Sequence, residues 1–172
     1  MTTPSPVVLD HLALAPAGIA LDVACGAGRH ALAIARTGRT VEAIDRDASA
    51  CARLADRARA EELPIRIVCA DLERLAPAAA RYALVVNTLY LDRLLVPALC
   101  RALRPGGVLL FETFTVEQLA SGHPRNPAFV LGPRELLDLI EGLEVIDHRE
   151  GPVVRDGRTL HLASLAARAP AA

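Results

Sequence analysis

The sequence predicts an α/β protein with a Rossmann-like, doubly wound and mostly parallel sheet in a single domain. Its 172 residues suit one compact domain, and 52% of them are apolar, which is enough for a sizeable core. Short apolar runs alternate with segments of helical periodicity, as in a parallel sheet covered by helices on both faces. A glycine-rich turn follows the first apolar run, where such folds bind ligands.

The first half of the chain carries three predicted strands and two predicted helices. A partly ordered lead-in is expected at residues 1–18, and the domain itself at residues 19–168. Short apolar runs predict strands at residues 19–24, 40–45 and 65–70. Periodic apolar positions predict helices at residues 29–37, before Gly38, and at residues 47–63, with Asp47 as N-cap.

The second half ends in two strands that no helix separates. We expect strands at residues 82–87 and 108–114, with a helix at 92–104 that is bent at Pro97 and has Arg101 and Arg104 in its last turn. Residues 115–132 follow no period, and a loop of this length is usually functional or mobile. A helix at 133–140 precedes strands at 143–150 and 159–167, which completes a seven-stranded sheet with an antiparallel C-terminal strand.

Charge and cysteine content exclude several classes of function. Every one of the 19 basic residues is Arg, which rules out lysine Schiff-base and Walker-type chemistry. The net charge is −1 and no long run of like charge occurs, so no nucleic-acid partner is expected. No signal peptide and no long apolar span is visible, which predicts a cytoplasmic protein without a membrane segment. Free thiols and no metal site are expected because no metal-ligand spacing links Cys25, Cys51, Cys69 and Cys100.

The glycine turn at residues 22–28 leaves more than one interpretation open. Glycines let the backbone approach a ligand closely and direct the next helix N-terminus toward it. Residues 26–31 also fit the dinucleotide pattern GxGxxG/A, and an ordinary tight turn is a further alternative.

Three aspartates help to decide among these interpretations of the glycine turn. Asp45 closes the second predicted strand, where it can accept ribose hydroxyls, and Asp71 closes the third, where it can receive an adenine amine. Asp22 precedes the glycines and can attract a cationic ligand. The carboxyl ends of parallel strands meet at one edge, so we expect the three carboxylates to share a crevice there.

This set of motifs resembles class I S-adenosylmethionine (SAM)-dependent methyltransferases over roughly residues 19–166. The similarity rests on Asp22-x-Ala24-x-Gly26-x-Gly28, Asp45, Ala70-Asp71, Asn87 and Pro105-Gly106-Gly107. Residues 111–114, 124–127 and 132–133 are similar to small bacterial members grouped with tellurite-resistance methyltransferases. Ala24 stands where many members have a glycine.

The resemblance implies SAM as cofactor, S-adenosylhomocysteine as product, and a role for each matching position. Gly26 and Gly28 would pack under the methionine and ribose parts, with the backbone of Ala24 and Cys25 beside them. Asp45 would hold the ribose, with Arg46 along the adenine. The adenine edge and the methionine amine would be met by Asp71, Leu72 and the Asn87 backbone. The region before Ile19 is short, so part of the usual lid is expected to be missing or supplied by another subunit of a homodimer.

The acceptor is expected to be a small molecule whose identity the sequence leaves open. Methyl transfer from a sulfonium is an in-line displacement that needs a base only when the acceptor must lose a proton. The candidates for a catalytic group are His123, Tyr90 and Glu112, and those for acceptor binding are Arg29, His30, Tyr90 and Arg125. Two alternatives compete with an enzyme of this kind, namely a non-catalytic SAM-binding regulatory subunit and an NAD(P)-dependent oxidoreductase.

Overall fold

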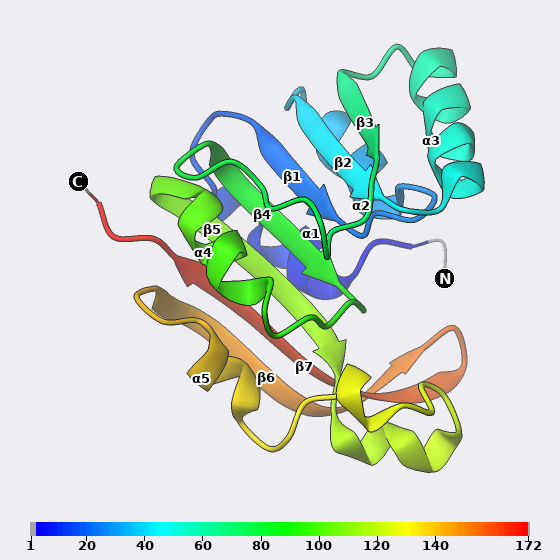
Figure 1. The fold of residues 1–172 in the computed structure, drawn as a ribbon, viewed down its shortest axis with the longest axis vertical. Helices are drawn as coiled ribbons and strands as arrows, with labels where there is room; N and C mark the ends of the chain where they lie inside the picture. Colours follow the sequence, from blue (N-terminus) through cyan, green and yellow to red (C-terminus); the bar gives the residue numbers. More distant parts are fainter. Residues whose placement is uncertain (1–2, 172) are drawn as a thin grey trace.

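The computed structural model of the protein describes residues 3–171 and contains a seven-stranded sheet of order β3-β2-β1-β4-β5-β7-β6. Strands β1 to β5 are parallel, and β7 is antiparallel to both β5 and β6 (Figure 1). The fold class predicted from the sequence is therefore confirmed, including the antiparallel C-terminal strand. The strands are β1 Ala20–Val23, β2 Val41–Asp45, β3 Ile65–Cys69, β4 Tyr82–Thr88, β5 Leu103–Phe114, β6 Glu144–Arg155 and β7 Arg158–Arg168.

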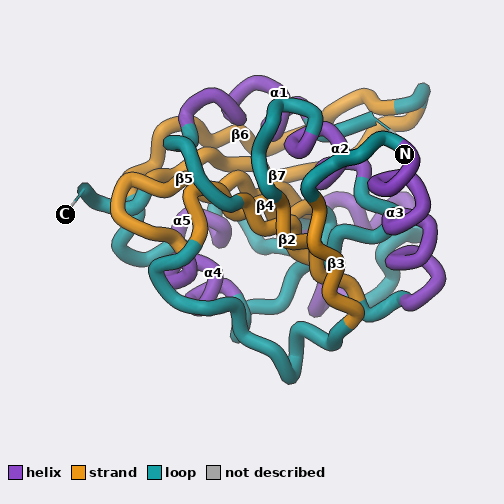
Figure 2. Tube along the Cα trace, turned by 90° about the horizontal axis from the view of Figure 1, so that it is seen from above, coloured by secondary structure: helices purple, strands orange, loops and turns teal. Residues whose placement is uncertain are grey.

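Helices cover both faces of the sheet. Figure 2 shows the strands between α1 and α2 on one side and α4 and α5 on the other. The helices are α1 Pro6–His11, α2 Arg29–Ala35, α3 Ala48–Ala60, α4 Val96–Ala102 and α5 Glu135–Leu139, with short 3-10 turns η1 Leu12–Leu14, η2 Val116–Ser121 and η3 Pro127–Phe129.

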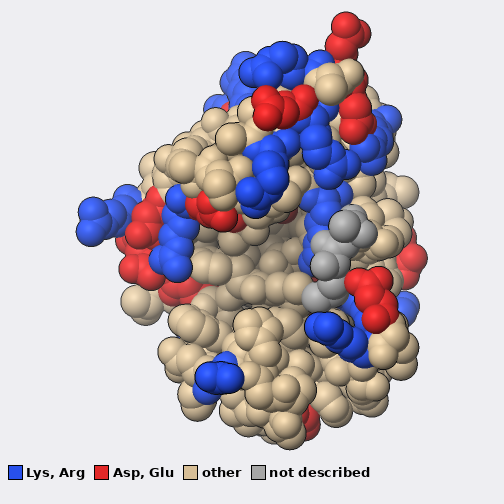
Figure 3. Space-filling model, turned by 90° about the vertical axis from the view of Figure 1, so that its right-hand side faces the viewer, with Lys and Arg blue, Asp and Glu red and all other residues tan. Residues whose placement is uncertain are grey.

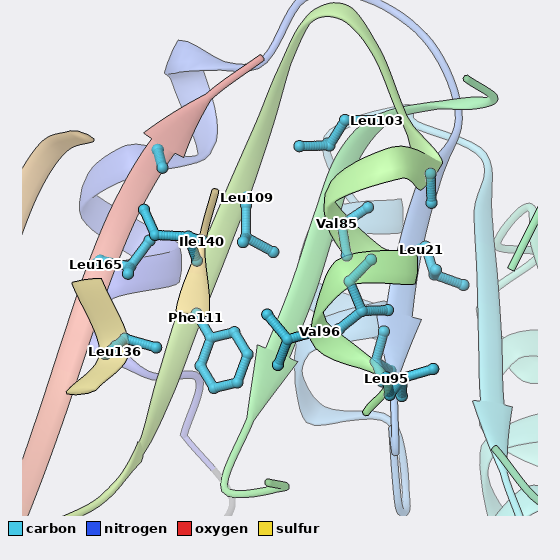
Figure 4. Packing of buried hydrophobic residues seen from close by; sticks show 14 of the residues in the cluster. Leu21, Val85, Leu95, Val96, Leu103, Leu109, Phe111, Leu136, Ile140 and Leu165 are labelled. Atoms are coloured by element: carbon cyan, nitrogen blue, oxygen red, sulfur yellow. The ribbon is translucent and has the colours of Figure 1, made fainter. Parts of the chain in front are cut away.

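The alternating side chains of the central strands form two hydrophobic cores. On one face, Leu109 and Phe111 of β5 pack with Val96 of α4 and Leu136 of α5, and all four are at most 1% exposed (Figure 4). On the other face, α1, α2 and α3 cover the opposite side of the same strands. Because both faces are buried, the strands read as continuous apolar runs in the sequence.

The boundaries of some elements differ from those predicted. Helix α4 begins at Val96, so Pro97 lies in its first turn, where a missing N–H costs nothing, and does not bend it. Strand β5 starts at Leu103, so Arg104 lies in the sheet and not in the last turn of the helix, and the Pro-Gly-Gly segment is part of the strand. Strand β6 continues to Arg155, so the turn to β7 is shorter than residues 151–158.

The first 18 residues contain more order than expected. Helix α1 has proline at its first position, and Val7 and Val8 are buried against the sheet. Ser5, just before this helix, is 1% exposed. Among residues 3–171, no helix has the length and hydropathy needed to span a membrane.

Candidate active site

The turn after β1 has left-handed backbone conformations at Ala24, Gly26 and Gly28, whose φ angles are 50°, 53° and 79°. For a non-glycine residue such as Ala24 this conformation costs about 1–2 kcal/mol. A Cβ on Gly26 would meet no atom within 4 Å, whereas a Cβ on Gly28 would lie 2.2 Å from Cδ1 of Leu54. Gly26 therefore faces open space, and Gly28 is required by the packing of α2 against α3.

A cavity of about 400 Å³ lies beside this turn, at the carboxyl ends of β2 and β3. We call it the aspartate cavity because Asp45 and Asp71 both line it. Oδ2 of Asp45 accepts the N–H of Gly26 at 2.7 Å, and Oδ1 accepts the N–H of Asp47 at 2.8 Å. Each carboxylate oxygen keeps a free lone pair. The other walls include Ala24, Arg46, Ala70, Leu72, Tyr90 and Asp92.

Two further cavities continue along the same edge. The glycine-turn cavity, also about 400 Å³, includes Ala24, Gly26 and Leu89 in its wall. The loop cavity, about 900 Å³, includes Leu89 and His123. Ala24 thus lies between the first and second cavities, and Leu89 between the second and third. In Figure 3 this side of the molecule is hollowed at its centre, with Arg, Asp and Glu gathered above the hollow and mostly uncharged side chains below it.

Asp22 does not line any of these three cavities. Its carboxylate is 1% exposed, and Oδ2 accepts the N–H of Ala31 at 2.9 Å. The other oxygen, Oδ1, is buried and has no hydrogen-bond partner among residues 3–171. Burial raises the pKa of Asp22 to about 7, because the charged form loses its hydration. Asn87 is similar, since its Nδ2 donates to the carbonyl of Tyr90 while its Oδ1 has no partner.

A buried polar network occupies the β5 side of the edge. Arg155 pairs with Glu112 through two hydrogen bonds, of which Nη1 to Oε1 is 2.6 Å long. The hydroxyl of Ser5 donates to the same Oε1 at 2.8 Å, and the N–H of Ser5 donates to Nε2 of His30 at 3.1 Å. Nε2 is therefore unprotonated, so Nδ1 carries the proton and donates to Oγ1 of Thr88 at 3.2 Å. Burial, with the positive charges of the nearby arginines, lowers the pKa of His30 to about 3.

The side-chain amide of Gln118 ties the first part of the long loop after β5 to β7. Gln118 is 3% exposed, and its Oε1 accepts the N–H of His161 on β7 at 2.7 Å. Its Nε2 donates to the carbonyl of His123 at 3.0 Å. The exposed His123 ring stands edge-on to Phe114, with the ring centroids 6.4 Å apart. These contacts hold His123 in the wall of the loop cavity.

Comparison with known proteins places this arrangement in a family. Residues 20–107, about half of the chain, match the model of the methyltransferase domain family.

The chain belongs to this methyltransferase family.

Individual relatives agree with this assignment. The ribosomal protein L11 methyltransferase of Dechloromonas aromatica is 37% identical over 102 residues, which are 58% of this chain and 33% of that protein. TehB from Haemophilus influenzae has the same fold, with a TM-score of 0.84 and 20% identity over 98% of this chain and 63% of TehB. A geranyl diphosphate C-methyltransferase from Streptomyces coelicolor, solved with S-adenosylhomocysteine, gives a TM-score of 0.73 at 19% identity over 94% and 74% of the two chains. The chain thus spans about a third of the curated relative and less than two thirds of TehB.

Membership of the methyltransferase family makes SAM the cofactor and S-adenosylhomocysteine the product. The residues present fit an adenosyl group with a cationic amino-acid tail. Carboxylates of Asp45 and Asp71 stand open to one cavity, and Gly26 leaves space where a Cβ would project. The Oδ1 atoms of Asp22 and Asn87 are buried acceptors without a partner among residues 3–171, and they would suit the ammonium group of such a tail.

The methyltransferase structure brings together most of the residues predicted for the cofactor. Ala24, Asp45, Arg46, Asp71 and Leu72 line the aspartate cavity, and Cys25 and Gly26 line the glycine-turn cavity. Gly28 lines neither, because Leu54 covers it. Asp22 and Asn87 lie buried behind these walls and are not part of them.

The residues predicted for the acceptor are more scattered. His123 lines the loop cavity, but Tyr90 lies in the aspartate cavity and Arg125 is exposed outside all three. His30 and Arg29 line the glycine-turn cavity. Glu112 is held by Arg155 and lines neither the loop cavity nor the glycine-turn cavity.

Sequence reasoning missed three residues at this edge of the methyltransferase. Ser5 lies in the segment expected to be a lead-in, and Arg155 in the segment expected to be a turn. Leu89 has a φ of 57° and joins the second cavity to the third. No local sequence pattern predicts these roles, because each role depends on partners more than 20 residues away or on a backbone angle.

Proposed function

We propose that the chain transfers a methyl group from SAM to a small-molecule acceptor bound in the loop cavity. The observation that carries this proposal is the row of three cavities linked by Ala24 and Leu89. The aspartate and glycine-turn cavities offer the carboxylates and open glycine that suit the cofactor, and the loop cavity adjoins them. A donor and an acceptor bound side by side in this row can be aligned for an in-line displacement.

The residues of the chain supply binding, alignment and exclusion of water. SAM supplies an electrophilic methyl group on a sulfonium when it is bound. Asp45 accepts ribose hydroxyls and Asp71 accepts the adenine amine, while the backbone at Gly26 lets the ligand approach closely. Leu89 is apolar and lines both the glycine-turn cavity and the loop cavity, so it borders the place where the two ligands meet and helps to exclude water there. His123 is the imidazole in the loop cavity and accepts a proton if the acceptor has to lose one.

Ligand-dependent thermal shift with SAM, S-adenosylhomocysteine, NAD and NADP tests the cofactor assignment. Stabilisation by the first two alone is expected.

Titration calorimetry should show that Asp45→Ala weakens the binding of S-adenosylhomocysteine about 10- to 100-fold, since a hydrogen bond to a charged group contributes roughly 1.5–3 kcal/mol. Asp47→Ala is the matched control, because Asp47 caps α3 and does not line the aspartate cavity. It should cost about 1 kcal/mol of stability with little change in affinity. Equal affinity of the wild type and Asp45→Ala would remove the proposed ribose site.

Methyl transfer itself is tested with labelled SAM and a panel of small acceptors. Labelled product and released S-adenosylhomocysteine are expected with at least one acceptor. His123→Ala should then lower the turnover without changing cofactor affinity, while Arg125→Ala, on the same loop but outside the cavity, should leave both unchanged. Tight cofactor binding without transfer to any acceptor would favour the non-catalytic alternative.

A further inference from the structure

Two cysteines lie against the segment that carries Asp45 and Arg46 of the aspartate cavity. Cys69 is the last residue of β3 and pairs with Asp45 in the β2–β3 register. Cys51 lies in the first turn of α3, which follows β2. The Sγ of Cys51 lies 3.5 Å from the carbonyl oxygen of Asp45, and the Sγ of Cys69 lies 3.9 Å from that of Arg46. The two thiols thus approach consecutive carbonyls of the segment that carries the proposed ribose ligand.

The two thiols lie close enough to influence each other's ionisation, and they differ in their access to solvent. Burial, followed by a hydrogen bond with the Cys69 thiol, raises the pKa of Cys51. Cys51 is 6% exposed, whereas Cys69 is open to solvent. An accessible thiol beside a shielded one is the arrangement in which the first reacts with an oxidant and the second resolves the adduct.

We propose that Cys51 and Cys69 form a dithiol site whose oxidation to a disulfide by a low-molecular-weight disulfide weakens cofactor binding. The sulfur of Cys69 attacks one sulfur of the reagent, which forms a mixed disulfide and releases one thiol. The sulfur of Cys51 then attacks the Cys69 sulfur and releases the second thiol. The protein loses two electrons and two protons, and both appear in the two reagent thiols that are released.

The link to binding follows from where the disulfide would form. Both S–H donors disappear, so the carbonyl of Arg46 loses the thiol contact that it has in the reduced protein. A disulfide also requires closer sulfur atoms than a thiol contact, which draws α3 and the end of β3 together. The segment between them carries Asp45 and Arg46, and Asp71 follows Cys69 by two residues. The effect on affinity therefore rests on the proposed placement of the cofactor, whereas the formation of the disulfide does not.

The test treats the full chain with glutathione disulfide and measures two independent quantities. Mass spectrometry should show the loss of two hydrogen atoms and a digest peptide that joins Cys51 to Cys69. Calorimetry should show that the oxidised protein binds S-adenosylhomocysteine about tenfold more weakly, the size of one lost hydrogen bond to a charged group. Reductant should restore both. Cys69→Ser and Cys51→Ser should each abolish the loss of affinity on oxidation.

Cys100→Ser is the matched control, since Cys100 lies on α4, on the other face of the sheet, and its removal should leave the response intact. A mixed disulfide on Cys69 that is never resolved would overturn the proposal, and so would a Cys51–Cys69 disulfide with unchanged affinity. If the reduced protein fails to bind SAM and S-adenosylhomocysteine, the proposed function fails as well, and the peptide map still reports whether the dithiol forms.

Discussion

The two halves of the carboxyl edge use their charged residues in different ways. Beside β2 and β3, Asp45 and Asp71 are partly exposed and line a cavity. Beside β5, Glu112 is 1% exposed and His30 is 2% exposed, and both are hydrogen-bonded within the protein. A carboxylate at the open rim keeps acceptor capacity for a ligand, whereas one that is buried against an arginine is already satisfied. Asp45 and Asp71 thus keep acceptor capacity toward a cavity, whereas Glu112 and His30 hold the N-terminal segment, α2 and the β6–β7 hairpin together.

Breaking the buried ion pair gives the largest expected effect. Glu112→Gln leaves the guanidinium of Arg155 buried without its counter-charge, which should lower the free energy of unfolding by about 3–5 kcal/mol. Urea denaturation measures this change. Glu61→Gln provides the comparison, because the Arg36–Glu61 pair has the same kind of contact but is largely exposed. That substitution should cost no more than about 1 kcal/mol. Equal losses in the two variants would show that the β5 half is not held by its buried pair.

The same contrast explains which parts of the site the sequence could predict. Asp45 and Asp71 follow strands that are recognisable as apolar runs, and parallel strands bring their carboxyl ends to one edge. Their convergence thus follows from the fold alone. The antiparallel end of the sheet is predictable from another pattern, because no helix separates the last two strands.

The β5 half depends on partners that no spacing reveals. Glu112 contacts Ser5, 107 residues away, and Arg155, 43 residues away. Its position at the end of a strand resembles that of Asp45, so a sequence pattern alone makes both look available to a ligand. Only the position of the N-terminal segment and the β6–β7 hairpin shows that Glu112 is already engaged. The start of α4 could not be predicted for a more local reason. A proline in the first turn of a helix and a proline at a bend look alike in sequence.

Within the glycine turn, two substitutions should separate stability from binding. Gly28→Ala adds a Cβ against Leu54, which is fully buried, and strains a left-handed backbone. Together these should cost about 2–4 kcal/mol of stability. Gly26→Ala meets no protein atom and should cost only about 1 kcal/mol, as Ala24 already shows that this turn accepts alanine at positive φ.

Affinity for S-adenosylhomocysteine should show the reverse order. The added methyl group of Gly26→Ala projects into open space at the glycine-turn cavity and should weaken binding more than Gly28→Ala does. Thermal denaturation and calorimetry on the two purified variants measure both quantities. If Gly28→Ala proved the weaker binder but the more stable protein, the assignment of the two glycines would have to be exchanged.

The last comparison concerns pH, which changes the stability contributed by His30 and by Asp22 with opposite signs. The pKa of His30 is about 3 in the folded protein and roughly 6.5 when unfolded, so the unfolded state binds the extra proton. Stability contributed by neutral His30 is complete above pH 6.5 and is lost as the pH falls toward 3. The pKa of Asp22, about 7, is raised above the unfolded value, so its contribution is complete below about pH 4 and is lost as the pH rises toward 7.

Comparing the wild type with a His30 variant isolates the contribution of His30 to the pH dependence of stability, because Asp22 is present in both proteins. Between pH 7 and pH 5 the wild type should lose about 2 kcal/mol more stability than His30→Gln, at 1.36 kcal/mol per pH unit below 6.5. If the stabilities of the wild type and His30→Gln changed with pH in parallel, protonated His30 would have to find a hydrogen-bond acceptor in the folded protein at low pH. The network of Ser5, Glu112 and Arg155 would then have to rearrange on acidification, and its hydrogen bonds would not hold the β5 half in one arrangement.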